Sequence, residues 1–338
     1  METITEAPEV VEEIRTTAMG STLHLVATGT DRNVCRGVLD RAMVMIQGLE
    51  ARWSRFRPTS EISCLNGAAP GTPVPVSDET ILLVQRGIEA WRRTGGIFDP
   101  SMLPAVIGAG YDRPFKELIS AAVPEPGPTE PIGRRHQPNL GGPTELAGSS
   151  DPDRHRLSGQ IEVDPIAGTV TLPPGCEFDP GGLGKGLAAD LVAGAGLSWG
   201  AAGMLVNLGG DLRCAGLPPQ RGAWAVAVGL GSSSNSGEPM IALVDGGVAT
   251  STHLRRRWQT RSGSAHHLID PATGRSAPSA ATATVIAATA CDAETLATTV
   301  AVCGGLPDER AMLGDAVVLV VDQCGNYSTH GEIERYLR

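Results

Sequence analysis

The feature that most constrains this chain is the glycine-rich stretch 177–193, EFDPGGLGKGLAADLVA. Three glycines separate Asp179 from Lys185, a fourth follows the lysine, and an apolar run with helical spacing comes next. Glycines permit a sharp turn and a close approach to the backbone, and the first turn of a helix attracts anions. With the charge of Lys185 added, the stretch predicts a site for a phosphate-bearing ligand. A glycine-rich turn before a core helix, with Lys185 solvated, accounts for the pattern about equally well.

Two familiar nucleotide motifs do not fit this stretch. A P-loop requires a glycine, four residues and then Gly-Lys-Ser/Thr, but Asp179 stands where the first glycine belongs and Gly186 where the hydroxyl belongs. The spacing of Gly182, Gly184 and Gly186 does not give the GxGxxG dinucleotide motif either. The stretch therefore belongs to neither class.

The composition limits the function classes. The chain has 338 residues, of which 41% are hydrophobic and 19% charged, as is typical of a globular protein with a substantial core. Its formal net charge of -10 argues against general binding to nucleic acid or to anionic membranes. An anion site in such a chain has to be local, built from backbone N–H groups, one or two cations and a metal ion where one is bound.

The N-terminus and the cysteines indicate the setting. Residues 1–16 are acidic and contain neither the basic nor the apolar region of a signal peptide, so we expect a short disordered lead. No apolar run reaches the length of a membrane span, and we expect no stable membrane insertion. The seven cysteines are dispersed and form no CxxC pair. This usage predicts reduced, mostly buried thiols, no structural zinc and a cytoplasmic protein.

Hydrophobic periodicity and glycine or proline punctuation divide the rest of the chain into helices and strands. The predicted helices cover 35–52, 60–65, 78–94, 187–195 and 294–303. The predicted strands lie within 17–27, 161–179, 203–216, 223–230, 240–252, 266–274, 283–290 and 316–322. Because helices and strands mix without strict βαβ alternation, we expect an α+β fold with mixed β-sheets layered with helices. We expect a single domain over 17–338 with a Pro/Gly-rich insertion near 122–158.

Three further clusters could carry chemistry, and each has an ordinary structural explanation. Glu294 and Thr298 lie four residues apart on one helix face and could share a hard cation, or Glu294 is a common acidic residue near a helix start. His267 could act as a general base or be a structural strand histidine. Phe98 could pack on a flat ring, and Asp99 could accept hydrogen bonds from that ring. Alternatively, the pair belongs to a turn with a core aromatic.

Taken together, these clusters belong to a longer series of motifs. The series is AMGST (18–22), WSRFRPTSEISCLN (53–66), TGGIFDPS (94–101), FDPGGLGKG (178–186), LVNLGGDLRCAG (205–216), VATST (248–252), HLIDPATGR (267–275) and AETLATTVAVCG (293–304). In this order the motifs resemble the FAD:protein FMN transferases, the ApbE family, over nearly the whole chain after the acidic lead. The resemblance implies an ApbE-like flavin transferase fold and a Mg²⁺-dependent transfer of FMN from FAD to a threonine or serine hydroxyl of a target protein, with release of AMP.

The resemblance also implies roles for individual residues. Those that fall where the family contacts FAD are Met19, Phe56, Ile97, Phe98, Asp99, Asp179, Lys185 and Thr250. Those that fall where the family holds the metal are Glu294, Thr298 and the Gly182 carbonyl. His267 matches the histidine beside the reacting phosphate, where Lys185 would neutralise charge as AMP departs. The implied partners are FAD and a protein acceptor.

Three departures from the family pattern stand out. Glu294 replaces the usual aspartate at the metal position, so that Asp292 could substitute or the metal affinity could change. The segment after Thr250 reads Ser-Thr-His-Leu and then three arginines, 255–257, in place of the usual Ser-Gly-acidic-Tyr. No export signal is present, which suggests a cytoplasmic acceptor. Two alternatives therefore stay open, a Mg²⁺-dependent FAD pyrophosphatase that gives FMN and AMP, and a non-catalytic FAD-binding protein.

Overall fold

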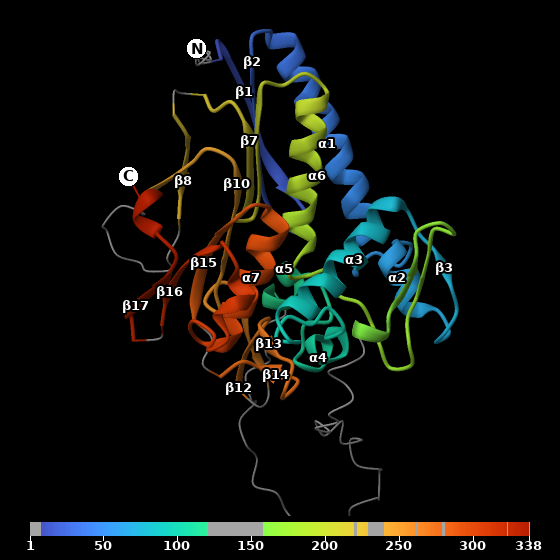
Figure 1. Cartoon of the computed structure of the whole chain (residues 1–338). Helices are drawn as coiled ribbons and strands as arrows, with labels where there is room; N and C mark the ends of the chain where they lie inside the picture. Colours follow the sequence, from blue (N-terminus) through green and yellow to red (C-terminus); the bar gives the residue numbers. More distant parts are fainter. Residues whose placement is uncertain are drawn as a thin grey trace, which may run out of the picture.

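An eight-stranded antiparallel sheet organises the computed structural model of the chain (Figure 1), which describes residues 8–120, 158–219, 222–228, 240–260, 263–278, 281–322 and 324–337. The strand order is β1-β2-β6-β7-β10-β15-β16-β17, and every neighbouring pair in this sheet is antiparallel. The strands are β1 (Val10–Ala18), β2 (Ser21–Gly29), β6 (Gly203–Leu208), β7 (Asp211–Gly216), β10 (Gly246–Ser251), β15 (Thr282–Ala287), β16 (Val317–Val321) and β17 (Tyr327–His330).

Helices and small sheets surround this sheet. The helices are α1 (Arg32–Trp53), α2 (Glu61–Gly67), α3 (Asp78–Arg93), α4 (Leu103–Gly108), α5 (Phe115–Ser120), α6 (Gly184–Ser198) and α7 (Ala290–Cys303). The smaller strands are β3 (Val74–Pro75), β4 (Glu162–Asp164), β5 (Thr169–Thr171), β8 (Trp224–Ala227), β9 (Met240–Leu243), β11 (Arg257–Thr260), β12 (Gly263–His266), β13 (Ile269–Asp270) and β14 (Arg275–Ser276). Short 3-10 helices cover Arg310–Leu313 and Ile333–Arg335.

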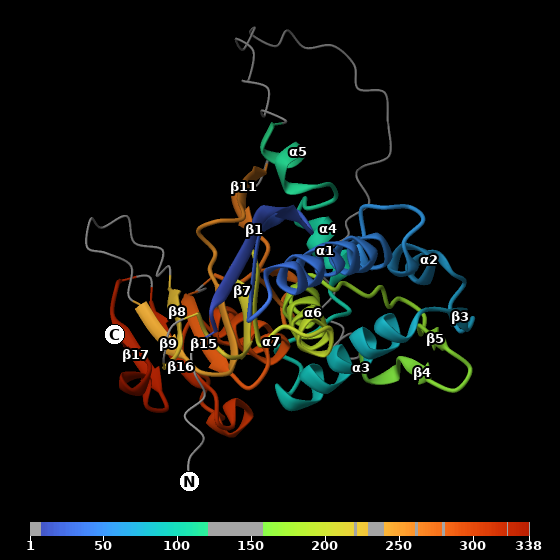
Figure 2. The same ribbon diagram turned by 90° about the horizontal axis from the view of Figure 1, so that it is seen from above.

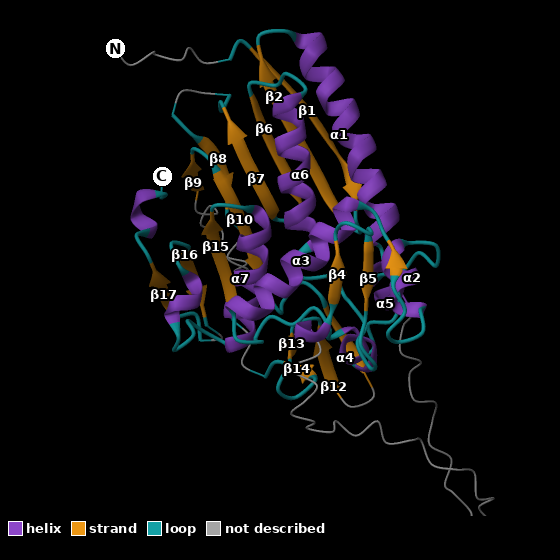
Figure 3. Ribbon diagram, turned by 45° about the vertical axis from the view of Figure 1, so that its right-hand side comes forward, coloured by secondary structure: helices purple, strands orange, loops and turns teal. Residues whose placement is uncertain are grey.

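The core lies between the large sheet and three helices. Helix α1 packs on β1 and β2, α6 on β6 and β7, and α7 on β10 and β15, so the three helices cover one face in sequence along the sheet (Figure 3). Helix α6 is apolar on most of its surface because α1, α7 and the sheet all contact it. The β8–β9 hairpin packs its Trp224 and Ile241 against the sheet in a separate apolar cluster.

The sequence predicted most of these elements. The α+β class is confirmed, and all five predicted helices are present, with bounds that differ by a few residues at some ends. The predicted hairpin within 161–179 is β4 and β5, turning at Gly168 with a positive φ of 66°. Helices α2 and α3 with β3, β4 and β5 lie on the side of the molecule away from β16 and β17 (Figure 2). The insertion expected near 122–158 lies outside the described residues except for Ser158.

One prediction about the N-terminus was wrong, and a second missed a turn. Residues 10–16 of the expected disordered lead belong to β1, an edge strand that pairs with β2 over its whole length. The strand expected over 17–27 is interrupted at Met19 and Gly20, which form the β1–β2 turn with φ of 49° and 69°. The turn pairs Ala18 with Ser21, so the alternation of side chains shifts by one residue here, and an interpretation of 17–27 as one strand misses that shift.

Helices α6 and α7 approach each other closely at Gly186. A Cβ at this position would lie 2.4 Å from the carbonyl oxygen of Ala290. Asp190, one turn later on α6, accepts the N–H groups of Ala290 and Cys291 at 2.8 and 2.9 Å. Burial raises the pKa of Asp190 to about 6, although these N–H groups oppose the rise. The start of α7 is thereby fixed on the first two turns of α6.

Replacing Gly186 with alanine is expected to destabilise the protein by at least about 3 kcal/mol, the upper end for an overpacked core, because the obstructing atoms are backbone. The matched control is Gly194→Ala on the exposed face of the same helix, where a Cβ meets nothing within 4 Å. That change is expected to stabilise by about 0.5–1 kcal/mol through helix propensity. Chemical denaturation of the two variants checks both signs, and equal effects would contradict the close contact.

The remaining sequence expectations concern the cysteines and membrane spans. All seven cysteines are free, and Cys35, Cys176, Cys214 and Cys291 are buried, as expected for mostly buried thiols. In the described part of the chain, no helix combines the length and the apolar character needed to cross a bilayer.

Candidate active site

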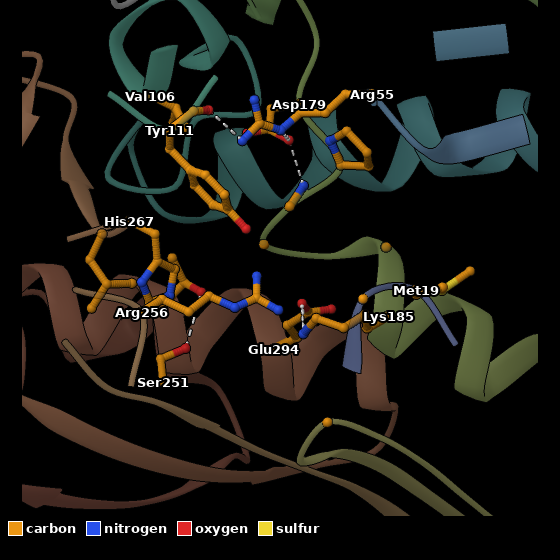
Figure 4. Close-up of a pocket in the computed structure, with 18 of the residues that line it drawn as sticks. Met19, Arg55, Val106, Tyr111, Asp179, Lys185, Ser251, Arg256, His267 and Glu294 are labelled. Carbon is orange, nitrogen blue, oxygen red and sulfur yellow. Dashed lines mark hydrogen bonds and ion pairs between the residues drawn. The ribbon is translucent and has the colours of Figure 1, made fainter. Parts of the chain in front are cut away.

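One cavity of about 710 Å³ collects the residues that the sequence motifs singled out. Its lining includes Met19, Phe56, Ile97, Phe98, Asp99, Asp179, Gly182, Lys185, Thr250, His267, Glu294 and Thr298. They come from the β1–β2 turn, the segments after α1 and α3, the loop before α6, strand β10, the β12–β13 connection and helix α7. Figure 4 shows that Lys185 and Glu294 lie on one side of this space, His267 on another, and Asp179 and Arg55 on a third. The fold thus brings together residues spread over most of the chain.

The strongest charge cluster in the cavity centres on Lys185. Its ammonium contacts Asp211 Oδ2 and lies 2.9 Å from Glu294 Oε1. Both carboxylate side chains are deeply buried, at 6% and 3% exposure, while Lys185 is 20% exposed. Two buried carboxylates beside one ammonium leave the cluster with a formal charge of -1, a setting that favours a further cation.

The carboxylate of Glu294 also accepts a hydrogen bond from the first turn of α6. Its Oε2 atom accepts the backbone N–H of Gly186 at 2.8 Å. The sequence suggested that this helix N-terminus and Lys185 bind a phosphate, but in the structure a carboxylate from α7 bonds to both. The glycine-rich stretch therefore fixes Glu294 in place, and the charge of Lys185 is already paired.

The residues expected at the metal form a set of oxygen donors. Glu294 and Thr298 lie one turn apart on α7, and a Cβ on Gly182 would lie 3.6 Å from Thr298 Oγ1, so this loop passes directly beside the hydroxyl. A carboxylate, a hydroxyl and a backbone carbonyl suit Mg²⁺, which keeps several waters and binds through few protein groups plus substrate phosphates. The described residues contain no cluster of three or more His, Cys, Asp or Glu that could bind a metal. The donor set fits a hard cation shared with a ligand.

Asp292, the sequence alternative to Glu294, is engaged elsewhere. Its Oδ1 atom lies 2.8 Å from the Arg93 guanidinium, and its Oδ2 accepts the hydroxyl of Thr289, the N-cap of α7. It does not line the cavity. The longer Glu294 side chain is therefore the carboxylate of α7 that reaches the site.

A second part of the cavity offers an open acceptor. Thr94 ends α3, and its hydroxyl accepts the N–H of Phe98 at 3.0 Å, which fixes the turn that carries Ile97, Phe98 and Asp99. Asp99 Oδ1 accepts the N–H and hydroxyl of Ser101 at 2.8 and 2.7 Å. Its Oδ2 is buried without a partner among the described residues. A buried carboxylate oxygen of this kind suits an N–H donor on a ligand ring.

An arginine between aromatic rings closes the third side. The Arg55 guanidinium lies 4.3 Å from the ring centre of Phe56 and 4.7 Å from that of Tyr111, and it donates to the Tyr111 carbonyl at 2.9 Å. Its Nε lies 3.9 Å from Asp179 Oδ1, which also accepts the N–H of Gly181 at 3.0 Å. Stacking and ion pairing together hold these groups at the cavity wall.

His267 is a neutral base at the cavity. Its Nδ1 atom is buried and has no hydrogen-bond partner in the described ranges. Desolvation, followed by the nearby charge of Arg256, lowers the pKa of His267 to about 3. The ring is therefore uncharged near neutral pH and has a free nitrogen. Thr250, by contrast, is held on β10 by a 2.9 Å hydroxyl contact with Thr284.

Several lining residues were not predicted from the sequence, among them Arg55, Tyr111, Asp211 and Arg256. Asp211 lies inside the quoted motif LVNLGGDLRCAG, directly after the Gly209–Gly210 turn, and that position was the available signal. Arg55 lies likewise inside a quoted motif. Tyr111 belongs to a segment without periodicity, so nothing in the sequence indicated it.

Comparison with known proteins extends these observations. The solved structure of the ApbE protein from Thermotoga maritima matches with a TM-score of 0.76 and 23% identity, covering 97% of this chain and 100% of that chain. The flavin transferase ApbE from Vibrio cholerae matches with a TM-score of 0.72 and 21% identity, covering 96% and 98%. The chain thus has the fold of the ApbE flavin transferases.

The sequence comparisons agree with the fold. A protein of Treponema pallidum named FAD:protein FMN transferase is 26% identical over 280 residues, which cover 79% of this chain and 71% of that protein. The model of the ApbE family matches residues 19–315, and the chain therefore belongs to the ApbE family.

Proposed function

We propose that this chain is a Mg²⁺-dependent FAD:protein FMN transferase, which moves FMN from FAD to a threonine or serine hydroxyl of a target protein and releases AMP. The observation that carries the proposal is the shared cavity, since residues from all eight sequence motifs line it. The name of the Treponema pallidum relative supports the same activity.

The chemistry follows from the residue types. Glu294, Thr298 and the Gly182 carbonyl would hold Mg²⁺, which when bound neutralises phosphate charge and makes AMP a better leaving group. Asp99 and the Arg55–Phe56 wall would orient the two ring systems of FAD. His267 would take the proton of the acceptor hydroxyl at its free Nδ1. The hydroxyl oxygen then bonds to the FMN phosphorus while the bond from that phosphorus to the AMP oxygen breaks.

The acceptor and the setting remain proposals as well. We infer a protein acceptor carrying a threonine or serine, and the cytoplasmic setting expected from the sequence stays a prediction. Water in place of the hydroxyl would turn the same site into a FAD pyrophosphatase, and the open Nδ1 of His267 serves either acceptor. A protein that binds FAD without cleaving it is the remaining alternative.

Mass spectrometry after incubation with FAD, Mg²⁺ and a candidate acceptor peptide tests the proposal. We expect an FMN-sized mass gain on a threonine or serine that EDTA prevents. Free FMN and AMP with unmodified peptides, across several candidate acceptors, would favour hydrolysis. Intact FAD under all conditions would reduce the protein to a flavin binder.

Replacing Asp179 with alanine is expected to weaken FAD binding by about tenfold, because the change removes a charged acceptor from the wall and leaves Arg55 unpaired. Asp164→Ala is the matched control, since Asp164 caps a turn through the N–H groups of Ile166 and Ala167 but lies away from the cavity. Fluorescence titration with FAD measures both variants. An unchanged affinity in Asp179→Ala would remove this residue from the site.

A further inference from the structure

The cations that line the cavity differ in how they are paired. Lys185 is bonded to Asp211 and Glu294, and Arg55 lies beside Asp179. Arg57, at the rim, lies 4.0 Å from Glu50. Each of these charges is therefore at least partly offset by a carboxylate. An anionic ligand gains little from a cation that is already paired.

Two further arginines of the lining, Arg255 and Arg256, have no ion-pair or hydrogen-bond partner for their guanidinium groups in the described ranges. Arg255 is exposed, whereas Arg256 is only partly exposed. Figure 4 shows its side chain reaching from the wall beside His267 into the cavity, toward Lys185 and Glu294. The segment that carries it, between β10 and β11, is anchored at one end by the buried Thr252 on Thr282 and at the other by the buried Trp258 on Ala109.

An unpaired guanidinium in a cavity attracts an anion. Arginine presents a planar fork of N–H donors that matches two phosphate oxygens, and these charged hydrogen bonds are among the strongest that proteins make. The position also faces the region where Glu294 and Thr298 would hold Mg²⁺. A pyrophosphate between them would meet positive charge from both sides.

We propose that Arg256 is the residue that binds the pyrophosphate of the dinucleotide substrate, in the role that the sequence assigned to Lys185. This inference rests on the proposed function, since it assigns the phosphate end of that ligand. It also gives a role to the segment 252–257, where the chain departs from the family pattern. Because Arg256 enters the cavity from beside His267 and extends toward Glu294, phosphates bound at its guanidinium would lie between these two residues.

Binding measurements on Arg256→Gln test the proposal, with four probes: FAD, inorganic pyrophosphate, riboflavin and adenosine. Arg257→Gln is the matched control, because Arg257 is the neighbouring arginine but is exposed, bonded to Ser264 and absent from the lining. By calorimetry in Mg²⁺ buffer, we expect Arg256→Gln to lower the affinities for FAD and pyrophosphate at least about tenfold. Riboflavin and adenosine, which lack phosphate, should bind as to the unmodified protein, and Arg257→Gln should leave all four affinities unchanged.

The outcomes separate this inference from the proposed function. If FAD and pyrophosphate bind Arg256→Gln as they bind the unmodified protein, the inference is wrong while FAD transfer stands. If the affinity for riboflavin falls as much as the affinity for FAD, Arg256 shapes the cavity and does not bind the phosphates. If the unmodified protein binds pyrophosphate but not FAD, the proposed function fails, and the pyrophosphate affinity of Arg256→Gln still decides the role of Arg256. Arg256→Lys is expected to recover part of the affinity, because it restores charge without the fork.

Discussion

Glu294→Gln is expected to lower Mg²⁺-dependent turnover about a hundredfold or more, since a metal-bound charge contributes several kcal/mol to the transition state. Glutamine is the sharper substitution because its amide oxygen can still accept the N–H of Gly186, which preserves the start of α6. What it removes is the negative charge that bonds to Lys185 and would bind the cation. The measurements are turnover against Mg²⁺ concentration and Mn²⁺ binding by electron paramagnetic resonance, which does not depend on activity.

The control for this prediction lies on the same helix. Asp292→Asn removes the same charge two residues away, but Asp292 pairs with Arg93 outside the cavity. We expect this variant to keep turnover within about twofold and to bind Mn²⁺ normally, since a partly exposed ion pair contributes little. If Glu294→Gln binds Mn²⁺ with unchanged affinity, or if Asp292→Asn is the variant that loses it, the metal assignment to Glu294 is wrong.

Which residues form the site was more predictable from the sequence than the contacts among them were. Motifs such as TGGIFDPS and HLIDPATGR are local, and each carries its chemistry within about ten residues. The contact between Glu294 and Gly186 joins residues far apart in the chain, and it changes what the glycine-rich stretch means. Local spacing identified a helix N-terminus suited to an anion, but it could not say that the protein supplies that anion from α7.

The same division holds for the fold. Helices α1 and α3 were predictable because their apolar residues repeat with helical spacing along a buried face. Strand β1 was missed because its sequence VVEEIRTTA is acidic, and an edge strand needs few apolar residues. The strand order, in which β2 pairs with β6, depends on packing that no local pattern encodes.

His267→Gln is expected to reduce FMN transfer by about 10²–10⁴-fold, the usual contribution of a general base, and to leave FAD affinity nearly unchanged. The prediction depends on the free Nδ1, which a glutamine cannot replace as a proton acceptor. His266→Gln is the control, because His266 is bonded to the Ala277 carbonyl and does not line the cavity. Single-turnover transfer and equilibrium FAD binding, measured on both variants, separate loss of chemistry from loss of binding. Equal transfer by His267→Gln and the unmodified protein would contradict the role.

The low pKa of His267 adds a signature that a catalytic assay alone cannot give. Its folded value of about 3 lies below the ordinary value of 6.5, so the unfolded chain binds more protons between these limits. The contribution of His267 to stability is therefore complete above about pH 6.5 and is lost as the pH falls toward 3. His267→Gln should remove this part of the acid sensitivity, which denaturation at pH 7 and pH 5 can measure. In the complex, the negative charge of the phosphates would raise the pKa of His267 toward the working pH. Burial would thus keep the base neutral in the free protein, and the substrate would make it strong enough to take a proton.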